Sequence, residues 1–71
     1  MMIYKVVRPD EVKAGDRVLY KDVVHTVELV EYAGPEFGTY IFMRDGMIAN
    51  FVDYVSVVDE ERTRDVLGRS A

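Results

Sequence analysis

The close spacing of turn signals is the feature that most limits what this chain can fold into. Up to residue 58, runs rich in Val, Ile, Tyr and Phe are interrupted every few residues by Gly, Pro or Asp. The runs between these interruptions have the length and the β-branched and aromatic composition of strands. The sequence therefore predicts an all-β domain of short antiparallel strands.

The strongest turn signal is Asp45-Gly46, because this dipeptide readily adopts the positive φ angles of a two-residue type I′ turn. Residues 39–44 and 47–52 would form the two arms of the hairpin. A two-residue loop also fixes which residues face each other across the hairpin. The predicted pairs are Arg44 with Met47, Met43 with Ile48, Phe42 with Ala49, Ile41 with Asn50, and Tyr40 with Phe51.

Both faces of this predicted hairpin are apolar, whereas an antiparallel sheet with one solvated face alternates apolar and polar residues. We expect the aliphatic face in the interior. The aromatic face then needs a cover, which is residues 3–7, the C-terminal segment or another molecule. The aliphatic face carries Ile41, Met43, Ile48 and Val52 with Asn50. The aromatic face carries Tyr40, Phe42, Met47, Ala49 and Phe51 with Arg44.

The remaining elements follow from the same pattern. Residues 23–32 predict one long strand or two joined segments, with residues 17–20 paired to them across Lys21-Asp22. Val23, Val27 and Leu29 would share one face, and Val24, Val30 and Tyr32 the other. From Asp59 the composition becomes charged and helix-forming, with acidic residues first. We expect a domain at residues 1–58 and a charged C-terminal tail or short helix at residues 59–71, fraying after Gly68.

The run Val-Lys-Ala-Gly-Asp-Arg-Val at residues 12–18 resembles the start of SH3-like small barrels of the KOW and Tudor type. In these, a Gly-Asp turn leads into the first strand, two hairpins follow, and a short turn precedes the last strand. Residues 23–32, 39–51 and 53–58 fill these places, so the resemblance covers about residues 12–58. It implies an SH3-like barrel of about five antiparallel strands. Such barrels bind proteins, RNA or DNA, and some are accessory domains of bacterial and phage proteins.

Size and composition narrow the functional classes. A chain of 71 residues forms one domain at most and buries only about 60% of its unfolded surface, so it depends on good packing or on a partner. It has no cysteine, which excludes disulfides and thiolate metal sites. No apolar run approaches the ~20 residues of a membrane span, and no signal-peptide pattern is present. We expect a cytoplasmic protein.

The net charge of −4 is unevenly distributed. Residues 1–22 hold five Lys/Arg and four Asp/Glu, residues 23–61 one Arg and eight Asp/Glu, and residues 62–71 three Arg and one Asp. Nucleic-acid binding depends on neutralising phosphates, so an acidic centre disfavours it. A protein partner is favoured instead.

Catalytic and ligand-binding patterns are missing from the sequence. Catalysis by a nucleophile needs a base beside it, and His25 is the only histidine, on a strand face with Val23 and Val27. We interpret it as a partly buried strand histidine. The run Asp59-Glu60-Glu61 is consecutive, so its side chains diverge and suit a solvated surface rather than a metal. The glycines fit no phosphate-binding loop. We expect no enzymatic activity, no cofactor and no metal.

A second candidate contact is the loop at residues 33–38. Phe37, among Gly and Pro, either projects towards a partner or closes one end of the barrel, and Tyr32 and Tyr54 share this ambiguity. With the aromatic face of the hairpin, Phe37 and Tyr32 give one set of predicted partner-binding residues. They are Tyr40, Phe42, Arg44, Met47, Phe51, Phe37 and Tyr32.

The leading functional hypothesis is a non-catalytic protein-interaction module that self-associates or binds another protein, as a bacterial or phage accessory protein would. The alternative is a nucleic-acid-binding small barrel that uses its basic N-terminal edge. The acidic surface also allows a mimic that occupies the basic site of a nucleic-acid-binding protein. The basic edge comprises Lys5, Arg8, Lys13, Arg17 and Lys21.

Overall fold

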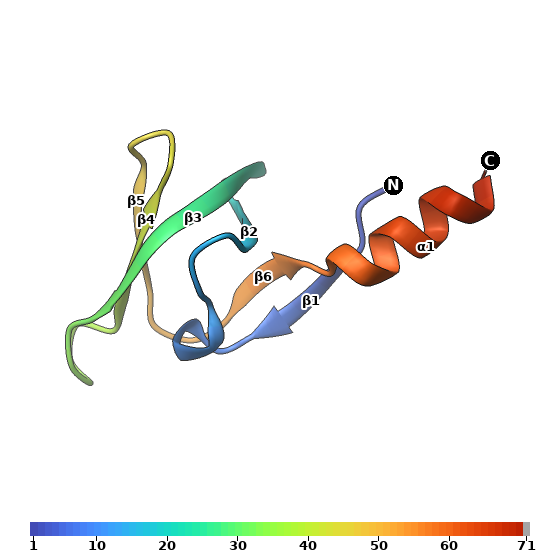
Figure 1. Ribbon diagram of the computed structural model, residues 1–71. Helices are drawn as coiled ribbons and strands as arrows, with labels where there is room; N and C mark the ends of the chain where they lie inside the picture. The colour runs from blue at the N-terminus through green and yellow to red at the C-terminus, as the bar shows by residue number, and fades with distance from the viewer. Residues whose placement is uncertain (71) are drawn as a thin grey trace.

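One antiparallel sheet of six strands dominates the computed structural model, which describes the backbone of residues 1–70 and the side chains of residues 1–68 (Figure 1). The strands are β1 (Tyr4–Val7), β2 (Arg17–Tyr20), β3 (Val23–Tyr32), β4 (Thr39–Met43), β5 (Ile48–Phe51) and β6 (Val55–Val58). The helical segments described are a 3-10 turn, η1 (Pro9–Glu11), and one α-helix, α1 (Glu60–Ser70).

The strand order is β1-β6-β2-β3-β4-β5. The all-β class is confirmed, with two corrections. There are six strands rather than five, because the N-terminal segment, one of the three alternatives for a cover, pairs with β6 as a strand of its own, β1. The sheet is also open: β1 and β5 are its two edges within the described chain.

The predicted hairpin between β2 and β3 is confirmed. Lys21 and Asp22 have φ angles of 50° and 64°, and they join strands paired in the register Tyr20 opposite Val23. Two consecutive positive φ values are the signature of a type I′ turn, whose twist matches that of the flanking strands. β3 then runs unbroken to Tyr32.

The register predicted for the β4–β5 hairpin is wrong by one residue. The loop contains residues 44–46: the Gly46 N–H donates to the Met43 carbonyl (3.0 Å) and the Met43 N–H donates to the Met47 carbonyl (2.8 Å). Gly46 has a φ of 93°, but Asp45 is not in the left-handed region, so a type I′ turn does not form. A type I turn followed by a left-handed glycine is the standard three-residue hairpin loop. The observed pairs are Phe42 with Ile48, Ile41 with Ala49, Tyr40 with Asn50, and Thr39 with Phe51.

This shift changes which side chains are buried, because side chains alternate between the two faces of a strand. Ile41 and Met43 lie in the interior as predicted. Ala49, which was predicted on the aromatic face, is also buried, while Ile48 is 54% exposed instead of internal. The division into an aliphatic and an aromatic face is therefore wrong.

A β-bulge in β3 shifts its alternation as well. The register with β4 slips between Val27 and Leu29, so Val27 pairs with Met43 but Leu29 pairs with Phe42. A bulge places an extra residue in one strand and reverses the facing of every residue after it. Val27 is therefore fully buried and Leu29 is 48% exposed, although the sequence predicts them on one face.

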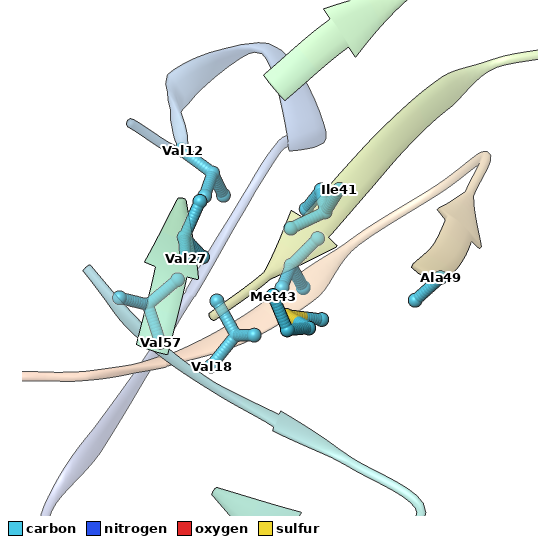
Figure 2. Packing of buried hydrophobic residues seen from close by; sticks show 8 residues of the cluster. Val12, Val18, Val27, Ile41, Met43, Ala49 and Val57 are labelled. Atoms are coloured by element: carbon cyan, nitrogen blue, oxygen red, sulfur yellow. The ribbon is translucent and has the colours of Figure 1, made fainter. Parts of the chain in front are cut away.

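The core lies inside the curved sheet and is mainly aliphatic (Figure 2). Val27 and Met43, paired across β3 and β4, point toward Val18 and Val57, paired across β2 and β6, and Val12, just after η1, closes the cluster. These side chains all lie within residues 12–57, and each of the strands β2 to β6 contributes at least one. The buried members are Val12, Val18, Val27, Ile41, Met43, Ala49, Val55 and Val57.

The C-terminal segment, predicted as a tail or short helix, forms α1 up to Ser70 rather than fraying after Gly68. Residue 71 of the predicted segment lies outside the described residues. The Asp59 carboxylate accepts the Arg62 N–H (3.1 Å), which caps the helix start. Arg17 of β2 holds the first turn through a bidentate ion pair with Glu60. Its Nε and Nη2 each donate to one oxygen of the Glu60 carboxylate at 2.7 Å. The helix projects away from the β4–β5 hairpin (Figure 1).

Candidate functional site

An apolar surface covers the outer face of β3, β4 and β5. Leu29, Phe42 and Ile48 form one row across the three strands, and Tyr40 lies in the next row between Glu31 and Asn50. Phe42 and Tyr40 are partly buried, whereas Leu29 and Ile48 are about half exposed. We call Leu29, Tyr40, Phe42 and Ile48 the outer-face patch. Apolar side chains gathered on one side of a sheet are a common mark of an interaction site.

Two irregularities in the backbone create this patch. The bulge between Val27 and Leu29 turns Leu29 outward, and the three-residue loop at residues 44–46 turns Ile48 outward. Without either one, the corresponding side chain would face the core. The patch therefore depends on the two places where the strands depart from regular alternation.

The loop at residues 44–46 is held in place by contacts with β3. His25, which is buried, has its Nδ1 at 2.6 Å from Asp45 Oδ2, and the Arg44 N–H donates to the Thr26 carbonyl (2.9 Å). Asp45 Oδ1 also accepts the Met47 N–H at 3.0 Å. The prediction of His25 as a buried strand histidine is confirmed, and its partner shows why the loop takes this form.

The electrostatics of Asp45 follow from these contacts. The hydrogen bond from the Met47 backbone, and then that from His25, hold the pKa of the Asp45 carboxyl below its ordinary value of 3.8. Both interactions favour the charged carboxylate. They fix the loop that sets the register of β5 and hence the outward position of Ile48.

A second concave feature lies at the opposite end of β4, beside the loop at residues 33–38. It is a groove of about 540 Å³ between this loop, η1 and the turn that follows β5. Tyr32, 68% exposed, and Pro35 form apolar walls, and Thr39 is buried beside them. The groove is also lined by charged residues, Asp53 and the ion pair of Arg8 with Asp10 (3.0 Å).

The predicted partner-binding residues do not form one site. Tyr40 and Phe42 lie in the outer-face patch, and Tyr32 lines the groove. Phe37 is 60% exposed, so it does not close one end of the fold, and the Asn50 side-chain amide donates to its carbonyl. The hairpin contributes two further predicted residues, Arg44 and Met47, which are exposed at the turn.

Phe51 is the predicted contact that the structure moves to the inner side. Its ring packs edge-on against Tyr20 with 5.7 Å between centroids, and it contacts the core cluster. The one-residue register shift is the cause. The same shift and the bulge explain why Ile48 and Leu29 were not among the predicted partner-binding residues. Apart from Gly46, no residue in the sequence marks either irregularity.

The basic residues of the N-terminal region are partly neutralised. Arg8 is paired with Asp10, and Arg17 with Glu60. The contact with Arg17 lowers the pKa of the Glu60 carboxyl. Lys21 lies with its Nζ 5.4 Å from the centre of the Tyr20 ring. Three of the five residues of the predicted basic edge are thus engaged in ion pairs or a cation–π contact.

Among the described residues, no three His, Asp or Glu side chains converge as metal ligands would. No helix described in the structure has the length and apolar character that crossing a bilayer requires.

Comparison with protein-family models, with curated proteins and with solved structures gave no match for this chain.

Proposed function

We propose that this chain is a non-catalytic protein-interaction module and that it binds its partner through the outer-face patch. The observation that carries the proposal is the pair of half-exposed aliphatic side chains, Leu29 and Ile48, flanking Phe42 in one row. Burying such a row removes apolar surface from water, at roughly 25 cal/mol per Å². Aromatic residues beside aliphatic ones are typical of protein contacts.

An SH3-like arrangement of residues 12–58 is part of this proposal. The turn at Gly15-Asp16 leads into β2, the hairpins β2–β3 and β4–β5 follow, and a short turn precedes β6, which pairs with β2. This order agrees with the pattern of small barrels that present binding residues on a rigid scaffold.

The experiment is a pull-down with the tagged full-length chain, comparing wild type with Leu29→Lys, each with and without nuclease. The matched control is Val6→Lys, which places the same charge at a similarly exposed apolar residue of β1, far from the patch along the sheet. We expect a nuclease-resistant protein partner that Leu29→Lys loses at least tenfold and Val6→Lys retains. Equal recovery by Leu29→Lys and wild type would contradict the proposal.

Nucleic-acid binding through the basic edge has less support, because ion pairs occupy Arg8 and Arg17. In the same pull-down, recovery of nucleic acid that falls steeply with salt would favour it. Loss of that recovery in Lys13→Glu, but not in Leu29→Lys, would place the contact on the basic edge.

A further inference from the structure

The outer edge of β5 is an open hydrogen-bonding strand. β5 pairs only with β4, and no described strand lies on its other side. The bond from the Met43 N–H to the Met47 carbonyl makes residues 43 and 47 a hydrogen-bonded pair. Such pairs alternate along an antiparallel ladder, so Ala49 and Phe51 bond to β4. Ile48 and Asn50 therefore direct their backbone N–H and C=O groups towards the free edge.

This edge lacks the features by which proteins protect exposed strands. Such edges are commonly protected by charged residues, especially lysine, or by proline. Residues 47–52 contain none of these, whereas the opposite edge strand, β1, contains Lys5. The row of the outer-face patch also ends at this edge, with Ile48 as its outermost side chain. A strand added here satisfies the open backbone groups and covers Ile48 in one step.

We propose that the strand added at this edge is β5 of a second copy of the chain, paired antiparallel about a two-fold axis at Ala49. The proposal rests on the function proposed above, since it names the partner at the border of the outer-face patch. In this register Ile48 of each copy lies opposite Asn50 of the other. Both residues face outward, so the pair forms four main-chain hydrogen bonds and is isologous.

Side-chain size supports this register. A non-hydrogen-bonded pair brings opposite Cα atoms to about 4.5 Å, the closest approach in an antiparallel ladder. The residue placed there is Ala49, the smallest side chain of β5. On the outer face, the row of Leu29, Phe42 and Ile48 in each copy then continues into Asn50 and Tyr40 of the other copy, so the two outer-face patches adjoin across six strands.

The lack of charge on this edge favours a second copy over a strongly basic or acidic partner. Residues 23–61 carry eight acidic residues and one Arg, so two copies repel each other wherever these acidic residues approach. The neutral edge at residues 47–52 is a place where two acidic copies can meet with no charged side chain within the paired strands. A basic partner would find no charge on β5 itself to recognise.

The test is sedimentation velocity of the full chain from about 10 µM to about 1 mM, the range expected for a small interface. We expect the mass to approach about twice 8.2 kDa and to stop there, because an isologous pair is closed. Asn50→Pro removes the outward N–H without disturbing the β4 ladder, and we expect it to remain monomeric. The matched control, Asn50→Ala, loses the same side-chain amide but keeps the N–H, and we expect it to dimerise.

Hydrogen exchange supplies a second measurement at the same concentrations. The Ile48 and Asn50 amides should gain at least tenfold protection on concentration, while the Ala49 amide is protected throughout. A chain that stays monomeric at 1 mM, growth beyond a dimer, or a dimer that Asn50→Pro retains would each overturn the pairing. If the wild-type chain stays monomeric but the pull-down still recovers a partner that Leu29→Lys loses, the proposed function stands and only the pairing fails. The two failures are therefore distinguishable.

Discussion

His25 and Asp45 join two hairpins at a single contact. The buried ring of His25 in β3 and the carboxylate of Asp45 in the loop between β4 and β5 are 2.6 Å apart. Asp45 also accepts the Met47 N–H, so one side chain ties the loop to itself and to the neighbouring strand. This contact makes the three-residue loop, and therefore the register of β5, sensitive to the charge of Asp45.

Acid should weaken the fold through this residue. The folded-state pKa of Asp45 is depressed, so its stabilising contribution is present above its unfolded value near 3.8 and is lost as pH falls through the lower folded pKa. We expect Asp45→Asn to be less stable than wild type at pH 7, with the difference shrinking below pH ~4. Urea unfolding at both pH values checks this, and a difference that does not change with pH would contradict it.

Gly38 lies where no other residue fits. It has a φ of 72°, and a Cβ there would lie 2.7 Å from the Phe51 carbonyl oxygen. We expect Gly38→Ala to lower the free energy of unfolding by about 2–4 kcal/mol, since it combines backbone strain with a clash. Gly34→Ala is the matched control, because Gly34 also has a positive φ but open space around it, and it should cost about 1 kcal/mol. Equal losses in urea unfolding would show that the clash is relieved by movement of β5.

At the scale of the elements, α1 is attached through its first turn. The Ile3 N–H donates to the hydroxyl of buried Thr63 (2.9 Å), and the Asp59 N–H donates to the Ile3 carbonyl (2.8 Å). The ion pair of Arg17 with Glu60 adds a contact to β2. The helix, the N-terminal segment and the sheet are thus joined at one point, beyond which the helix extends outward.

Removing the Thr63 hydroxyl should loosen this junction. In Thr63→Val the Ile3 N–H loses its partner in a partly buried site, and we expect a loss of about 1–3 kcal/mol in unfolding free energy. Thr63→Ser keeps the hydroxyl and should lose less than half as much. Faster amide exchange at Ile3 in the valine variant alone would place the effect at the junction. If the two variants lose equal stability, the methyl group of Thr63 matters rather than its hydroxyl.

The whole molecule is elongated, with a principal extent of 45 Å against 22 and 19 Å. Its core cluster comes entirely from residues 12–57, while α1 lies at one end beyond β1 and β6 (Figure 1). The core and the projecting helix therefore contribute to stability by separate sets of contacts.

Truncation should separate these contributions. A chain ending at Asp59 keeps every buried member of the core cluster, and we expect it to fold with a β-type circular dichroism spectrum. It should be less stable than the full chain, because it loses the Thr63 junction and exposes Val58, which is 2% exposed in the full chain. A disordered spectrum for the truncated chain would show that α1 is required for folding.

Most of the elements were predictable because their signals are local, and β1 is the exception. The β2–β3 turn, the extended segment that forms β3 and the acidic start of α1 each follow from residues within a few positions. The candidate site was only half predictable: Tyr40 and Phe42 were identified, whereas Leu29 and Ile48 were missed and Phe51 was misplaced. All three errors have one origin, because a shift of one residue in a strand reverses the facing of its side chains.

By itself, the sequence determined which segments extend and where the chain turns, since φ preferences and β-branched side chains act locally. The tertiary structure decided the register of β5, the bulge in β3 and the pairing of β1 with β6. These depend on contacts distant in sequence, such as His25 with Asp45 across 20 residues and Ile3 with Thr63 across 60. The outer-face patch follows from this second group, because packing alone selected which side of each strand faces solvent.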